Sequence, residues 1–153
     1  MADAVRGGGS RKGTVAVVVV ALASLGLLLA RAQRPPAGVE PVAWDREACA
    51  YCRMHVGDPR FAAQLQTEAG EVLNFDDPGC LMRSVNERHP AVRAIYFHDA
   101  REARWRARDE TGFVPMAVTP MGYGLAATGR DAIGAIGYEE ATARVAARRE
   151  VMR

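Results

Sequence analysis

The sequence has few of the residues that usually bind metals. Among its 153 residues are only three cysteines and three histidines. A structural zinc site takes four ligands, usually from two close pairs, and this chain has a single close pair, Cys49 and Cys52. The cysteine spacing therefore fits no common zinc module. Cys80 and one histidine could still complete a set of four ligands with Cys49 and Cys52.

The chain also lacks a strong charge of either sign. Its formal net charge is +2. Residues 1–32 carry four basic groups and one acidic group, which leaves 16 basic and 17 acidic groups on the other 121 residues. A nearly neutral body gives no electrostatic reason to expect nucleic acid as a partner.

Charge is absent altogether from Gly13 to Ala30, an apolar segment of 18 residues. This length is at the lower limit for a helix that spans a bilayer. Basic residues precede it, so residues 1–12 are expected in the cytoplasm. The segment is expected to be a transmembrane anchor or a signal peptide cut after Ala30-Arg31-Ala32. Both interpretations predict an extracytoplasmic body, and the lack of a cysteine near residue 30 excludes a lipoprotein.

The Pro-rich stretch over residues 31–43 is expected to be a linker, and residues 44–153 one folded domain. In the first half of this domain, apolar and polar residues alternate over 61–67 and return over 72–75, which predicts a hairpin. Asp77 and Pro78 are typical of a helix start, and Pro90 of a helix end. Residues 92–97 then predict a third strand, giving β-β-α-β.

The second half repeats this pattern more weakly. Strands are expected over 103–107, 113–118 and 125–128, a short helix over 131–136 and a longer helix over 139–149. The predicted fold is therefore α+β, with two ββαβ-like halves, antiparallel sheet and a preceding membrane helix.

The sulfur-containing side chains are the strongest chemical signal. Cys52 and Met54 are two residues apart and would point to the same side of an extended segment. Thiolate and thioether are the ligands that Cu(I) prefers. Met121, in a Pro-Met-Gly loop, is a candidate third donor. Alternatively, Cys49 and Cys52 form a thioredoxin-type dithiol, although no β-α-β unit surrounds them.

Other candidates have simpler interpretations. Cys80, in the first turn of the predicted helix, is expected to be a small buried residue. Asp76 and Asp77 are expected to be capping residues. Four residues near the Cys-x-Met pair or the helix start are possible additional ligands: Cys49, His55, Asp76 and Asp77.

Three segments together resemble the NosL family. "YCRMH" resembles its Cys-Gly-Met segment, "NFDDPGCLM" its Phe-Asp-Asp segment, and "TPMGYGLAA" its Thr-Pro-Met-Gly-x-Gly segment. They occur in the same order and together span most of residues 48–128. Arg53 stands where the family usually has glycine, and the C-terminal segment lacks the expected Gly-Gly-strand ending.

The resemblance implies a fold of two ββαβ halves and an extracytoplasmic Cu(I)-binding chaperone, not an enzyme. Such a protein would supply copper to nitrous oxide reductase, a related copper enzyme or an assembly complex. By the resemblance, Cys52 and Met54 match the copper ligands and Met121 the Pro-Met-Gly methionine. Asp76 and Asp77 match paired acids beside the site. A structural assembly factor that binds no metal is the third possibility.

Overall fold

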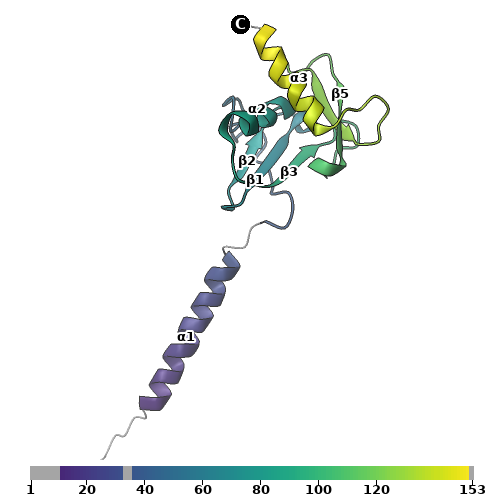
Figure 1. Cartoon of the computed structure of the whole chain (residues 1–153). Helices are drawn as coiled ribbons and strands as arrows, with labels where there is room; N and C mark the ends of the chain where they lie inside the picture. Colours follow the sequence, from purple (N-terminus) through teal and green to yellow (C-terminus); the bar gives the residue numbers. More distant parts are fainter. Residues whose placement is uncertain (1–10, 33–35, 152–153) are drawn as a thin grey trace, which may run out of the picture. The chain divides into compact units, whose positions relative to one another are not determined.

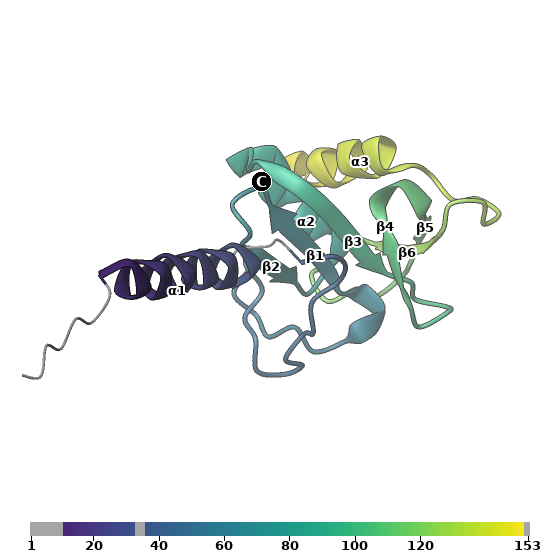
Figure 2. The ribbon, with the colours of Figure 1, turned by 90° about the horizontal axis from the view of Figure 1, so that it is seen from below.

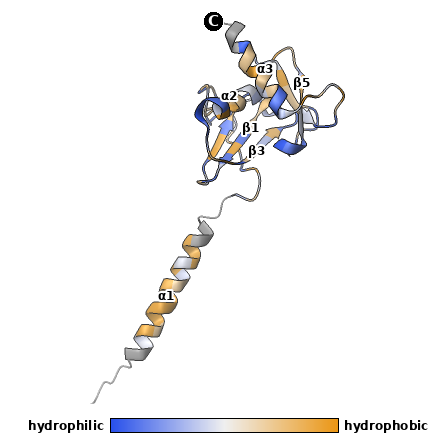
Figure 3. Cartoon of the chain, viewed as in Figure 1, coloured by the Kyte–Doolittle hydropathy of each residue, from blue (hydrophilic) through white to orange (hydrophobic). Residues whose placement is uncertain are grey.

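The structure is a computed structural model, and it describes residues 11–32 and 36–151 of the chain. The chain divides after Arg34 into two compact units, each described here by itself (Figure 1). The first unit contains α1 (Arg11–Ala32), which is mostly hydrophobic (Figure 3). Within the described residues, however, no helix combines the length and apolarity required to cross a membrane. The expected transmembrane anchor is thus not supported, and most of the expected cytoplasmic segment, residues 1–10, lies outside the described residues.

The first strands of the second unit form the hairpin that the alternation of apolar and polar residues predicts. After a short 3-10 helix, η1 (Pro59–Phe61), come β1 (Ala63–Thr67), β2 (Val72–Phe75), α2 (Pro78–Arg88) and β3 (Val92–His98). The predicted first half, β-β-α-β, is confirmed. β4 (Trp105–Ala107) completes an antiparallel sheet of order β2-β1-β3-β4.

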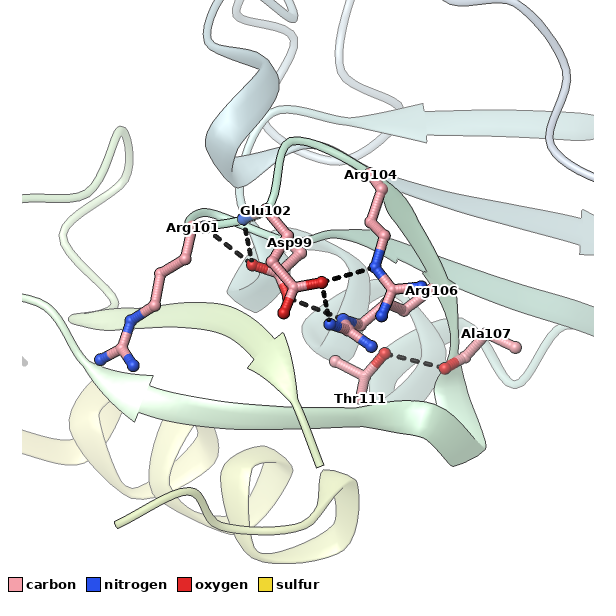
Figure 4. Close-up of polar contacts among 7 residues, drawn as sticks. All are labelled: Asp99, Arg101, Glu102, Arg104, Arg106, Ala107 and Thr111. Carbon is pink, nitrogen blue, oxygen red and sulfur yellow. Dashed lines mark hydrogen bonds and ion pairs between the residues drawn. The ribbon is translucent and has the colours of Figure 1, made fainter. Parts of the chain in front are cut away.

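A buried ion pair closes the turn between β3 and β4 (Figure 4). Arg106 donates to the Asp99 carboxylate at 2.6 Å and to Glu102 at 2.7 Å. The other oxygen of Asp99 accepts the backbone N–H groups of Arg101 and Glu102. Because both Asp99 and Arg106 are buried, these bonds satisfy charges that would otherwise be costly to bury.

The second half of the unit differs from the predicted ββαβ repeat. After η2 (Arg108–Glu110), β5 (Thr111–Pro115) and β6 (Leu125–Gly129) form a separate antiparallel pair, followed by α3 (Tyr138–Val151). β4, predicted to start this half, instead pairs with β3. No strand follows α3 in the described residues, so the fold is α+β but not two equivalent halves.

The short helix predicted over residues 131–136 is wrong. Gly134 has a φ of +75°, in the left-handed region, which interrupts a right-handed helix. Ile136 exchanges both backbone hydrogen bonds with Phe113 of β5, each at 2.9 Å. The segment is therefore a turn that ends in an isolated bridge.

The core of the second unit lies between helices α2 and α3 and the strands. Phe75, Phe97 and Phe113 are completely buried, and the rings of Phe97 and Phe113 meet edge to face at 4.9 Å. α2 packs against β1 and β2, and α3 packs against β5 and lies beside α2 (Figure 2). α2 contributes the buried Leu81 and Met82, at the helical spacing that the sequence shows.

Part of the Pro-rich segment is attached to the sheet. The buried side chain of Gln64 exchanges two hydrogen bonds with the backbone of Glu40, each at 2.9 Å. The buried Gln66 donates to the carbonyl of Gly38 at 2.6 Å. Because proline keeps this segment out of a helix, its backbone groups are available to the glutamines. Residues 38–40 therefore belong to the packing of the body, which the linker composition did not predict.

Candidate metal centre

The segment that carries Cys49 and Cys52 is a closed turn. An isolated bridge joins Ala48 to His55, and the N–H of Cys49 donates to the carbonyl of Met54 at 2.7 Å. The N–H of Arg53 donates back to the carbonyl of Cys49 at 3.1 Å. Arg53 has a φ of +69°, so the backbone reverses between Cys52 and Met54. The segment is therefore a turn, and the predicted extended conformation is wrong.

Helix α2 brings Cys80 to this turn. The carboxylate of Asp77 caps the helix by accepting the N–H of Gly79 at 2.8 Å, and Pro78 occupies the first helical position. Cys80 follows within the first turn. The N–H of Ala50 donates to the carbonyl of Asn74 on β2 at 2.9 Å, which holds the cysteine turn beside the strand that leads into α2.

These elements bring the thiols of Cys49, Cys52 and Cys80 together, with the three sulfur atoms within 4.8 Å of one another. Three donors at about 2.3 Å from one ion, the usual metal–thiolate distance, would lie about 4 Å apart. Small side-chain adjustments therefore suffice to bind a single ion. All three cysteines are free. Among the His, Cys, Asp and Glu side chains that the structure describes, these three form the group that could hold a metal.

The three thiols differ in their access to solvent. Cys49 and Cys80 are completely buried, whereas Cys52 is half-buried. An ion in the cluster would therefore be shielded from solvent on the side of Cys49 and Cys80. An acceptor protein would reach the ion from the side of Cys52. Cys52 is the ligand that an incoming donor reaches first.

One thiol of the cluster, that of Cys49, is ionised at neutral pH without a bound metal. A hydrogen bond from the thiol of Cys80, with backbone N–H groups of Asp76, Cys52 and Tyr51, lowers the pKa of Cys49 to about 5 against the effect of burial. The same bond to Cys49, together with burial, raises the pKa of Cys80. Burial also raises the pKa of Cys52. Because thiolate is the metal-binding form, a bound cation replaces the protons of Cys52 and Cys80.

Asp76 and Asp77 bind backbone groups beside the cluster. Asp76 accepts the N–H of Gly57 at 3.2 Å. Asp77 is fully buried and accepts the N–H of Gly79 and, through its second oxygen, that of Met121 at 3.1 Å. Burial raises the pKa of both carboxyls. The contacts of Asp77 fit the expected capping role, whereas Asp76 binds the backbone of the loop at Gly57 and does not cap α2.

The predicted thioether ligands lie at the surface. Met54 is 59% exposed and Met121 is 37% exposed. The backbone of each is tied to the site, Met54 through Cys49 and Met121 through Asp77. His55 is exposed, and its backbone closes the cysteine turn. The role of these three side chains as ligands remains a prediction.

Sequence reasoning gave too little weight to Cys80. Its predicted burial is correct, but a small buried thiol and a buried ligand look the same in sequence. The available signal was its position, three residues after the capping Asp77. A helix N-terminus is a place where a thiolate is favoured.

The fold and the three thiols together define a small α+β domain with a candidate soft-metal site. No known family model and no curated sequence matches this chain. Among solved structures, the chain is similar to the crystal structure of the copper chaperone NosL from Shewanella denitrificans, with a TM-score of 0.54 and 18% identity. The match covers 74% of this chain and 89% of that chain. The expected resemblance to NosL is therefore confirmed at the level of the fold.

Proposed function

We propose that this protein is a metallochaperone that binds Cu(I) through Cys49, Cys52 and Cys80 and delivers it to a copper-requiring partner. The observation that carries the proposal is the convergence of three free thiols within 4.8 Å, with one of them accessible. The fold shared with a copper chaperone supports it.

The donor set favours Cu(I) over Zn²⁺. Thiolate and thioether ligands suit Cu(I), whereas structural zinc sites use four protein ligands in a tetrahedron. The group found among the described residues has three members. A three-sulfur site with a half-buried edge suits a transferable ion better than a permanent structural one.

Transfer would proceed at Cys52. A donor from the acceptor would join the ion there, and Cys49 and Cys80 would be displaced after Cys52. Met54 and Met121, the predicted thioether ligands, are exposed and available to bind the ion as it leaves. The role requires binding and exchange rather than catalysis.

The acceptor and the compartment follow from the sequence resemblance alone. We propose nitrous oxide reductase, a related copper enzyme or its assembly complex as the acceptor. We also propose an extracytoplasmic location, since basic residues precede the apolar N-terminal segment.

Anaerobic Cu(I) titration against a chromogenic chelator tests the binding proposal. The purified protein should compete for one Cu(I) ion per chain, and the Cys49→Ser, Cys52→Ser, Cys80→Ser triple variant should not compete. A parallel titration with Zn²⁺ is the control for selectivity. Equal Cu(I) binding by the wild-type protein and the triple variant would contradict the proposal.

One observation favours a second candidate function, a thiol–disulfide protein that uses Cys49 and Cys52. The pKa of Cys49 is lowered to about 5, as in some redox-active thiols. Cys49 is completely buried, however, so a substrate could not reach this thiolate directly. Reversible oxidation in a redox buffer, lost in Cys49→Ser while Cu(I) binding persists, would favour this candidate. Absence of both activities would favour a structural assembly role.

A further inference from the structure

Tyr51, between Cys49 and Cys52, has its side chain anchored on helix α2. Its hydroxyl donates to Glu87 at 3.0 Å. The guanidinium carbon atoms of Arg83 and Arg88 lie 5.1 and 5.6 Å from its ring centroid, within the range of cation–π contacts. A tyrosine hydroxyl is protonated at neutral pH, so it can donate the hydrogen bond to Glu87.

Two of the three charged residues, Arg83 and Glu87, form an ion pair. Arg83 donates to the second carboxylate oxygen of Glu87 through Nε, at 3.1 Å, and through Nη2. Arg88 donates to the backbone carbonyl of Ala50 at 3.1 Å. The cysteine turn is thus attached to α2 through both the Tyr51 side chain and the Ala50 backbone.

The other loop at the site is attached to the same helix. Arg83 also donates to the hydroxyl of Tyr123 at 3.5 Å. The Tyr123 ring packs against Gly79, where an added Cβ would lie only 2.2 Å from the ring. The helix that carries Cys80 therefore orders both surrounding loops, and Arg83 touches a tyrosine from each.

We propose that Tyr51, Arg83, Glu87 and Arg88, named here the tyrosine clamp, position Cys52 over the buried thiols and so slow the release of Cu(I). The inference rests on the proposed function. Cys49 and Cys52 flank Tyr51, whereas Cys80 lies on the helix that holds it. Loss of the clamp would therefore let the two cysteines of the turn move relative to the third. The four residues are positioning residues and are not metal ligands.

An isolated exposed ion pair contributes little to stability, so the clamp must be distinguished from an ordinary surface network. Tyr51→Phe removes only the hydroxyl bond, whereas Tyr51→Ala removes the ring contacts as well. Tyr96→Ala, at a half-buried tyrosine on β3, is the control for loss of a ring. Arg144→Gln, in the exposed Arg144–Glu140 pair of α3, is the control for Arg83→Gln.

The first measurement is the rate of Cu(I) transfer from the loaded full-length protein to an excess of chelator. Tyr51→Ala should accelerate transfer about tenfold, and Tyr51→Phe about two- to threefold. Arg83→Gln should also accelerate it, whereas both controls should transfer at the wild-type rate. A wild-type rate in Tyr51→Ala would overturn the inference. Equal acceleration in Tyr51→Ala and Tyr96→Ala would also overturn it, because the effect would then be general destabilisation.

A metal-free measurement separates this inference from the proposed function. Iodoacetamide should modify the buried Cys49 and Cys80 several-fold faster in Tyr51→Ala than in the wild-type protein or Tyr96→Ala, as read by mass spectrometry. Unchanged modification would show that the clamp does not hold the thiols together. If the wild-type protein bound no Cu(I), the proposed function would fail, and this comparison would still decide whether the clamp positions the cysteines.

Discussion

The buried carboxylate of Asp77 accepts the backbone N–H of Met121 at 3.1 Å while its other oxygen caps α2. One side chain therefore joins the start of the helix that carries Cys80 to a loop 44 residues further along the chain. This relationship explains how two segments that are separate in sequence are ordered around one site.

Asp77→Asn should lower the free energy of unfolding by about 1–3 kcal/mol, the cost of leaving a buried donor unpaired. The amide of asparagine offers one accepting oxygen where the carboxylate serves two N–H groups. Urea denaturation measures the change. Asp58→Asn, at the more exposed cap of η1, is the control and should have a smaller effect. Equal stability of Asp77→Asn and wild type would contradict the double role of this carboxylate.

Arg53→Gly should stabilise the protein by about 0.5–1 kcal/mol, because Arg53 has a left-handed φ of +69° that glycine adopts more readily. The resemblance to NosL predicts glycine at this position. Ala103→Gly is a matched control, since Ala103 has a φ of +50° in a turn away from the cysteines. Both variants should raise the denaturation midpoint and keep Cu(I) binding. A loss of stability in Arg53→Gly would refute the strain argument.

Gly79→Ala should destabilise the protein by about 1–3 kcal/mol, because the new methyl group would overlap the Tyr123 ring in a packed site. Gly57→Ala provides the comparison. There the added Cβ would lie 2.8 Å from an Asp45 carboxylate oxygen, which is at the end of a side chain that can move. Thermal unfolding should show the larger loss in Gly79→Ala, and the reverse order would be inconsistent with this packing.

The metal-free protein should contain one thiolate at neutral pH. The pKa of Cys49 is lowered from 9.0 to about 5, so the ultraviolet thiolate absorbance should disappear as the pH falls through about 5. The ionised thiol stabilises the fold by an amount that grows as the pH rises from about 5 to about 9, and this contribution is absent at lower pH. Cys49→Ser should remove both the absorbance change and that part of the pH dependence. A wild-type protein without thiolate absorbance at pH 7 would contradict this.

The first half of the fold was predictable because its signals are local. The alternating hairpin, the Asp77–Pro78 helix start and the Pro90 stop each depend on a few neighbouring residues. The second half was less predictable. The bridge between Ile136 and Phe113 is a long-range contact that competes with helix formation, and no local pattern reports it.

The site was predictable only in part. The segment with Cys49 and Cys52 was identified as the candidate site, but it was expected to be extended, because Arg53 is not a residue that signals a left-handed backbone. The meeting of Cys80 with Cys49 and Cys52 depends on how α2 packs beside β2. Spacing in sequence carries no information about such packing.

The central claim is that Cu(I) is held by the three thiols, and X-ray absorption at the copper edge tests it most directly. The loaded wild-type protein should show three sulfur neighbours at about 2.3 Å. Cys80→Ser should lose one of these neighbours, whereas Met54→Leu should keep all three. An unchanged sulfur count in Cys80→Ser, together with a loss in Met54→Leu, would contradict the claim and favour the Cys52–Met54 site predicted from sequence.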